Sequence, residues 1–190
     1  MLKLRIGTHR DLEKYYLAFR NDFDEKELLP KLSIHKAMLK GDMELCIIYD
    51  DTTGLEYAYG LTIKRNIYGY VLLKYFGVLP FYQGQGMGVN AMRLINKHYA
   101  DTQGLIAELT VFDDEDDKTL KKLRKFFARF GYVKLNSDYR IGGSPVELMV
   151  KSIKGSEDIE KVEHRIINDF YSRVLSASAM SRMIDIKAVK

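Results

Sequence analysis

The sequence predicts an α/β fold, a mixed α+β sheet flanked by helices. Two observations carry this expectation. In the first half of the chain, short apolar runs are separated by turn residues, as in antiparallel hairpins, while other segments repeat apolar residues at helical spacing. Further along, a strand-like run meets a glycine-rich stretch and then a helical pattern, which predicts a right-handed crossover to a parallel strand.

Length and composition set the broad class of protein. A chain of 190 residues, 46% of them hydrophobic, is expected to bury a single core without disulfides. The net charge of +4 is mild and its basic residues are spread along the chain, so no nucleic-acid partner is expected. No apolar run approaches the roughly 18 residues of a membrane span, and the first residues lack the apolar core of a signal peptide. We therefore expect a cytoplasmic protein without a membrane partner.

The chain opens with one strand and two helices. Alternating leucine and isoleucine predict a first strand over residues 2–6, and Thr8 is expected to cap the helix that follows. The helical spacing then continues until Pro30, which is expected to break it. Ser33 is the expected cap of the second helix, and Gly41 is its expected end.

The remaining elements complete the sheet. Further strands are expected at 44–49, 57–63, 70–78, 105–112, 132–139 and 146–153. A helix after Gly88 connects the fourth strand to the fifth, so a right-handed crossover would make these two strands parallel. Another helix is expected at 116–130. Together these elements predict one domain over residues 1–152.

Residues 83–88, Gln-Gly-Gln-Gly-Met-Gly, lie where the strand pattern gives way to the helix pattern. Glycine lets backbone N–H groups approach an anion closely, and a helix N-terminus adds its unpaired N–H groups, so this junction predicts a phosphate cradle. An ordinary tight turn is the alternative. The stretch lacks the Gly-Lys-Ser/Thr ending of a Walker loop and does not match the G-x-G-x-x-G spacing of Rossmann folds, so neither an NTPase nor a dinucleotide enzyme is expected.

Three motifs, in the same order, resemble those of a known family. Gln83, Gly86 and Gly88 fit the acetyl-CoA loop of the GNAT superfamily of N-acetyltransferases, in which Gln or Arg is followed by two residues, Gly, one residue, and Gly or Ala. Residues 78–82, Val-Leu-Pro-Phe-Tyr, resemble the family's lead-in to that loop. Residues 126–132 resemble its later helix, which ends in glycine and an aromatic residue. The chain is therefore similar to that family.

The resemblance covers about residues 1–150, most strongly 70–132, and it implies a ligand. In that family the fourth and fifth strands splay apart, and acetyl-CoA lies in the gap as co-substrate with its pantetheine arm paired to the fourth strand like an added strand. Carried over to this sequence, the resemblance implies acetyl-CoA contacts at Phe76, Val78, Leu79, Gln83, Gly84, Gln85, Gly86, Met87 and Gly88.

The resemblance also implies direct attack of an amine on the thioester in a ternary complex, after the amine loses a proton to a base. Glu108, on the fifth strand where many members use an acidic residue, is the candidate base; a solvent-facing or salt-bridged carboxylate is the alternative. The Tyr that usually protonates the departing thiolate is replaced here by Phe127. Tyr82 is the candidate acid, while Tyr75, Tyr132 and water remain open.

An acidic run at residues 113–117 follows the fifth strand. Asp113 and Asp114 are the candidate contacts for a cationic amine substrate, because ligand sites open at the carboxyl ends of parallel strands. Alternatively, these carboxylates cap the next helix and favour its dipole. The four histidines and Cys46 lack metal-ligand spacing, so no metal site is expected. The acceptor itself stays open between a small molecule, a peptide N-terminus and a lysine.

Residues 153–190 exceed what such a domain needs and predict an added C-terminal helix. The apolar face of this helix is formed by Ile159, Val162, Ile166, Phe170 and Val174. The face must be covered, either by the same domain or by a second subunit of a homodimer. Two functions follow from the sequence: an acetyl-CoA-dependent amine N-acetyltransferase, or a non-catalytic acyl-CoA-binding or regulatory module, which the missing Tyr keeps open.

Overall fold

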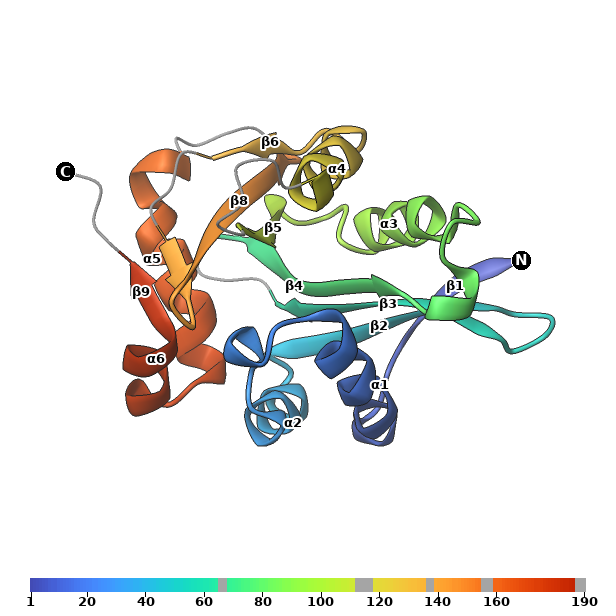
Figure 1. Ribbon diagram of the computed structural model, residues 1–190, viewed down its shortest axis with the longest axis horizontal. Coiled ribbons are helices and arrows are strands. Elements are labelled where there is room, and N and C mark those ends of the chain that lie inside the picture. The colour runs from blue at the N-terminus through green and yellow to red at the C-terminus, as the bar shows by residue number, and fades with distance from the viewer. Residues whose placement is uncertain (65–67, 112–117, 136–138, 155–158, 187–190) are drawn as a thin grey trace.

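The computed structural model describes residues 1–64, 68–111, 118–135, 139–154 and 159–186, and it has a central sheet with helices on both faces (Figure 1). The strands are β1 (Leu2–Ile6), β2 (Met43–Asp50), β3 (Glu56–Ile63), β4 (Tyr70–Val78), β5 (Gly104–Thr110), β6 (Val133–Lys134), β7 (Tyr139–Ile141), β8 (Ser144–Ser152) and β9 (Ile184–Ile186). The helices are α1 (His9–Asp22), α2 (Lys31–Lys40), α3 (Met87–His98), α4 (Lys118–Ala128), α5 (Ile159–Val174) and α6 (Ala177–Met183), with 3-10 turns η1 (Glu25–Glu27) and η2 (Pro80–Tyr82).

The described strands form one mixed sheet in the order β1-β2-β3-β4-β5-β8-β7-β9, with β6 pairing to β8. β1 to β4 are antiparallel neighbours, whereas β4 and β5 are parallel and β8 returns antiparallel to β5. Helix α3 lies between β4 and β5 in the chain, so it is the crossover that parallel pairing requires. The structure confirms the predicted fold class and the parallel pair within it.

Two hydrophobic cores lie on opposite faces of the sheet. One contains side chains of α1, α2 and α5, among them Leu12, Ile34 and Phe170. The other contains side chains of α3 and α4, among them Met92 and Leu120. Figure 1 shows α3 and α4 above the sheet and α1 and α2 below it. Because strand side chains alternate between faces, both cores receive side chains from β2, β3, β4, β5 and β8.

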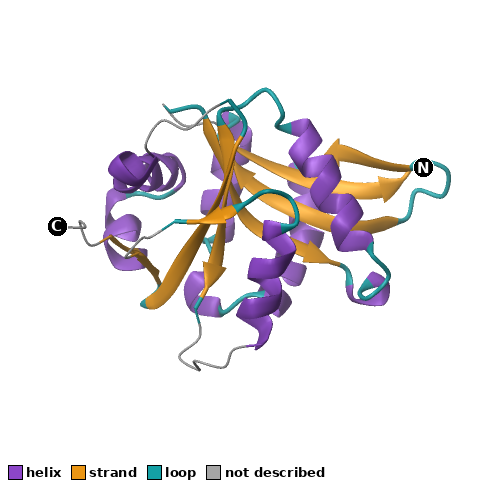
Figure 2. Ribbon diagram, turned by 90° about the horizontal axis from the view of Figure 1, so that it is seen from above, coloured by secondary structure: helices purple, strands orange, loops and turns teal. Residues whose placement is uncertain are grey.

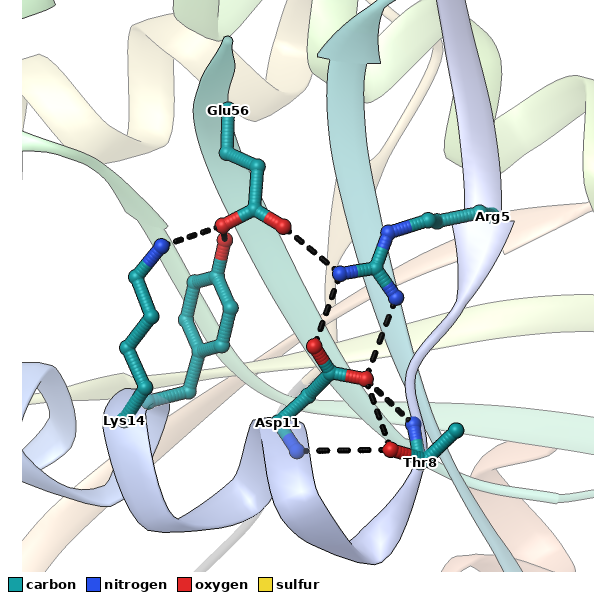
Figure 3. Close-up of polar contacts among 6 residues, drawn as sticks. Arg5, Thr8, Asp11, Lys14 and Glu56 are labelled. Atoms are coloured by element: carbon teal, nitrogen blue, oxygen red, sulfur yellow. Dashed lines mark hydrogen bonds and ion pairs between the residues drawn. The ribbon is translucent and has the colours of Figure 1, made fainter. Parts of the chain in front are cut away.

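The start of α1 is tied to the sheet by a polar cluster (Figure 3). Thr8 is the N-cap, as predicted, and with Asp11 it forms a capping box in which each side chain accepts from the other's backbone N–H. Arg5 of β1 donates to both oxygens of Asp11 and to Glu56 of β3. The guanidinium beside Asp11 holds the pKa of that carboxyl well below its ordinary value.

Several predicted boundaries differ from the structure. The helical spacing expected to continue until Pro30 ends earlier, since α1 ends at Asp22 and a 3-10 turn, η1, precedes Pro30. Ser33 lies inside α2, whose N-cap is Pro30, because the fixed φ of proline already favours the helix start without a side-chain cap. Helix α3 begins at Met87, so Gly88 belongs to its first turn. The strand expected at 132–139 is represented by two short strands, β6 and β7, which both pair with β8. Gly41 does end α2, in a left-handed conformation with φ 79°.

The C-terminal segment packs on its own chain. Ile166, Phe170 and Tyr171 of α5 are fully buried or nearly so, in the same core as α1 and α2. Beyond α6, β9 pairs with β7 and extends the sheet by one strand. Figure 1 shows α5, α6 and β9 gathered beside β8. The described side chains of the apolar face, Ile159, Ile166, Phe170 and Val174, are thus covered within this chain.

Three further findings concern the thiol of Cys46, membrane spans and metal sites. Cys46 is fully buried, and burial raises the pKa of its thiol to about 12. None of the described helices combines the length and apolarity needed to cross a membrane. Within the described ranges, no three His, Cys, Asp or Glu side chains gather as ligands of one metal ion would.

Candidate active site

β4 and β5 separate part-way along their length. Their parallel pairing runs from Tyr70 opposite Gly104 to Leu73 opposite Ala107 and stops there, although both strands continue. Figure 2 shows the sheet from above, with its strands fanning out rather than staying side by side. This separation is the predicted splay between the fourth and fifth strands.

A β-bulge in β4 lies at the point of separation. Leu61 of β3 pairs with Tyr75, and the next residue of β3 pairs with Leu73, so Lys74 is the extra residue. A bulge increases local twist, which favours divergence from β5. It also shifts the alternation of side chains: Leu73 and Phe76 face the α3–α4 core, while Tyr75 faces the opposite one. Lys74 is thereby placed in the gap.

A cavity of about 190 Å³ occupies this gap and is lined by residues from both sides of the sheet. Its apolar wall belongs to the α3–α4 side and includes Leu73, Phe76, Ala107, Leu109, Leu123 and Phe127. Its polar wall lies on the other side and includes Asp22, Asp24, Glu27, Lys74, Glu108 and Thr110. The cavity is therefore apolar on one side and polar on the other.

Glu108, the predicted base, lies on the cavity wall and is 4% exposed. Its Oε2 accepts from Nζ of Lys74 at 2.8 Å and from the hydroxyl of Tyr171 at 2.8 Å. Its Oε1 accepts from Tyr171 at 2.8 Å and from Tyr139 at 3.1 Å. Burial and the charge of Glu108 raise the pKa of both tyrosines well above its ordinary value, so both remain hydroxyl donors. The contacts of Glu108 are thus those of a salt-bridged carboxylate, which is the alternative to a base.

A second buried carboxylate, Glu27 of η1, lies on the polar wall of the cavity and is 6% exposed. Its Oε2 accepts from the hydroxyl of Thr110 at 2.6 Å. Burial raises the pKa of Glu27 above its ordinary value. Sequence reasoning did not identify Glu27. The expected helix break at Pro30 is the one sign in the sequence that the segment before it leaves the helix.

Phe127, which replaces the family's Tyr, lines the cavity and is 3% exposed. The three tyrosines considered as acids lie elsewhere. The hydroxyl of Tyr132 donates to a side chain of α3, and the hydroxyl of Tyr75 donates to a backbone carbonyl of η1. The ring of Tyr82 packs against Tyr57, with centroids 4.5 Å apart, and Tyr82 is not among the described residues that line the cavity.

The predicted phosphate loop is held open by its glycines and braced by its glutamines. Gly84 and Gly86 have φ of 76° and 77°, and a Cβ at either would point into open space. The amide of Gln83 donates to the carbonyl of Val78 at 3.0 Å, and that of Gln85 donates to a carbonyl of η2 at 2.9 Å. The side chains therefore fix the loop, and its backbone remains available.

The loop leads directly into α3. Gly86 is the N-cap and provides no side-chain hydrogen bond, so the first-turn N–H groups at Met87 and Gly88 are not capped by it. A Cβ on Gly88 would lie 3.4 Å from a methyl of Val78, a tight contact. An uncapped helix N-terminus behind two glycines in left-handed conformation fits a pyrophosphate.

The free edge of β4 faces the same gap. The N–H of Leu79 donates to the carbonyl of Tyr57 in the direction of β3, at 2.8 Å. Consecutive strand residues direct their backbone groups to opposite sides, so those of Phe76 and Val78 point toward the gap. Among the predicted contacts Phe76, Val78 and Leu79, the N–H of Leu79 is thus already bonded, and the carbonyl of Val78 already accepts from the amide of Gln83. Asp113 and Asp114, the predicted amine contacts, lie outside the described residues.

Comparison by sequence found no matching protein-family model and no matching curated protein. Comparison by structure did find matches. A putative GNAT-family acetyltransferase from Bacteroides thetaiotaomicron matches with a TM-score of 0.70 at 17% identity, over 90% of this chain and 96% of that one. A dodecameric spermidine N-acetyltransferase from Vibrio cholerae matches with a TM-score of 0.62 at 14% identity, over 80% of this chain and 94% of that one.

A eukaryotic protein shares the same architecture. Arabidopsis thaliana NAA60, solved in complex with a bisubstrate analogue, matches with a TM-score of 0.60 at 14% identity, over 82% of this chain and 100% of that one. These proteins and this chain share little sequence but nearly the whole arrangement of elements. The chain therefore has the fold of the GNAT acetyltransferases.

Proposed function

We propose that this protein is an acetyl-CoA-dependent N-acetyltransferase in which a primary amine attacks the thioester directly in a ternary complex. One observation carries the proposal: a cavity lies between the splayed β4 and β5, apolar toward α4 and lined by carboxylates toward α1. A cavity lined from both sides of the sheet would hold the donor and the acceptor together. Direct transfer requires both substrates to be bound side by side.

The donor would bind on the α3–α4 side. The backbone of the Gly84–Gly88 loop and the start of α3 would hold the pyrophosphate, with Gln83 and Gln85 bracing the loop. The backbone groups of Phe76 and the N–H of Val78 would pair with the pantetheine arm as an added strand would. Phe127 and its apolar neighbours would surround the thioester and exclude water.

The acceptor would bind on the polar side, where Asp22, Asp24, Glu27 and Glu108 outnumber the cation Lys74. This excess of carboxylates favours an amine that arrives with a positive charge. The matched enzyme from Vibrio cholerae acts on spermidine, a cationic amine, which is in keeping with an acceptor of that class.

A thiol-release assay across a panel of amines tests the proposal. The panel contains a polyamine, an aminoglycoside, a lysine peptide with a blocked N-terminus and a peptide with a free one. We expect CoA thiol to form with at least one cationic amine, in equal amount to the acetylated product. Calorimetry with acetyl-CoA alone establishes binding of the donor independently of turnover.

A second candidate function, a non-catalytic acyl-CoA-binding or regulatory module, is favoured by one observation. Phe127 occupies the cavity wall where the family's proton-donating Tyr would stand, and a phenyl ring cannot protonate a thiolate. Tight binding of acetyl-CoA without thiol release from any amine would support this module and contradict the transferase.

A further inference from the structure

The two buried carboxylates on the cavity wall, Glu27 and Glu108, differ in how many hydrogen bonds they already accept. Glu108 accepts from three donors, the ammonium of Lys74 and the hydroxyls of Tyr139 and Tyr171, and the single O–H of Tyr171 lies within hydrogen-bond distance of both oxygens. Protonation of Glu108 would remove the negative charge that the buried ammonium of Lys74 faces. Glu27 has a single side-chain hydrogen bond within the described residues, from Thr110 to Oε2, and its second oxygen is unoccupied by any described donor.

We propose that Glu27, rather than Glu108, takes the proton from the acceptor ammonium, and that the Lys74–Glu108 ion pair is a positioning unit beside it. This inference rests on the proposed function and deepens it. It assigns the base to η1, between α1 and α2, and it assigns the acceptor as an amine that binds protonated.

Glu27 is held in place by the two strands that form the gap. The hydroxyl of Tyr75, on β4, donates to the backbone carbonyl of Glu27 at 3.1 Å and accepts from the N–H of Leu29 at 2.8 Å. Thr110, on β5, donates to its carboxylate. A base must be fixed within hydrogen-bond reach of the proton it removes, and these contacts fix η1 over the cavity.

The charges around Glu27 suit a base. Asp24 faces it from the start of η1 and Glu108 from β5, and Asp22 at the end of α1 lines the same cavity. Lys74 faces it from β4. Burial is the largest cause that raises the pKa of Glu27; Asp24 and Glu108 raise it further, while the Thr110 hydrogen bond and Lys74 oppose them. A carboxylate with a raised pKa accepts a proton more readily near neutral pH.

The step balances as follows. The Glu27 carboxylate accepts one proton from R–NH₃⁺, which leaves a neutral carboxylic acid and R–NH₂. The nitrogen lone pair forms a C–N bond to the thioester carbonyl carbon, and the C–S bond then breaks with its electron pair on sulfur. The nitrogen, still carrying an extra proton, passes it to the thiolate. The products are the amide, CoA thiol and a protonated Glu27 that returns its proton to solvent.

This route needs no tyrosine at position 127. The thiolate receives the proton that the attacking nitrogen must lose in any case. A phenylalanine at that position is then compatible with turnover, because it lines the thioester side of the cavity without entering the proton path.

The test compares three isosteric variants in kcat against pH, with the best amine of the panel. Glu27→Gln should lower kcat by about 100-fold or more and abolish its rise on the acidic side, while leaving the acetyl-CoA dissociation constant unchanged. Glu25→Gln, exposed on the same turn, should match the wild type. Glu108→Gln should keep the acidic rise. With a weakly basic amine that is neutral at the assay pH, the Glu27→Gln defect should shrink at least tenfold.

Thr110→Val provides a second readout should Glu27→Gln fail to fold. Removing the hydrogen bond that lowers the pKa of Glu27 should move the acidic rise of kcat to higher pH. The proposal is overturned if Glu27→Gln folds and keeps both rate and pH profile, if Thr110→Val leaves the rise in place, or if Glu108→Gln abolishes it. Absence of turnover in the wild type would instead contradict the transferase function itself, and with it the assignment of Glu27 as the base.

Discussion

At the scale of single residues, the Lys74–Glu108 ion pair is the contact expected to be most sensitive to substitution. Both side chains are almost fully buried, at 3% and 4% exposure, and both come from the strands that diverge around the cavity. Burying a charge away from water costs free energy unless an opposite charge is buried beside it. Each of these two side chains is therefore tolerated in the interior only while the other is present. The hydroxyls of Tyr139 and Tyr171 complete the shell of Glu108.

This dependence predicts non-additive mutations. Lys74→Met should destabilise the protein by about 3–5 kcal/mol, because it leaves Glu108 buried without a countercharge. The double variant Lys74→Met with Glu108→Gln should recover much of that loss, since no uncompensated charge remains. Urea unfolding of the two single variants and the double variant measures the coupling. Strict additivity would show that the pair is solvated rather than buried.

At the scale of elements, the capping box of α1 predicts a pH dependence. The Arg5 guanidinium lowers the folded-state pKa of Asp11 below its ordinary value, so the native state binds this proton less readily than the unfolded state. The stability that Asp11 contributes is therefore complete above its unfolded pKa of about 4 and is lost as pH falls below it. Asp11→Asn should lower Tm at pH 7 and progressively less from pH 5 to pH 2. A constant Tm difference over this range would contradict the assignment.

The loop before α3 predicts a binding defect without a folding defect. Gly86→Glu places a side chain and a negative charge at a left-handed position of the loop, so acetyl-CoA affinity should fall at least tenfold, measured by calorimetry. Gly143→Glu, in the β7–β8 turn, is the matched control, because its φ of 87° imposes the same strain and its Cβ also meets open space. Equal loss of affinity in both variants would mean that the loop does not bind the donor.

At the scale of the whole molecule, the sequence predicts what is local. The separation of β4 and β5 is implied by the family resemblance. Strand periodicity, turn residues and the glycine junction predict the antiparallel start and the crossover, and Thr8 and Gly41 mark helix α1's start and α2's end. Those features depend on neighbours within a few residues.

The site could be predicted only in part, because its polar side chains meet across long stretches of chain. Thr110 lies 83 residues from Glu27, and Tyr171 lies 63 residues from Glu108. Neither contact leaves a periodic signal. The bulge that turns Lys74 into the gap is likewise invisible, since it is one extra residue in a strand that otherwise alternates. The C-terminal helix shows the same limit, because its Tyr171 donates to Glu108 on the cavity wall.

The central claim is that an acetyl donor and an amine acceptor react in the cavity between β4 and β5. Mass spectrometry of the reaction mixture tests this claim most directly, with wild-type protein, acetyl-CoA and the amine panel. We predict an N-acetylated product of a cationic amine that accumulates in step with CoA thiol. Acetyl-CoA that binds tightly but stays intact with every amine would contradict it.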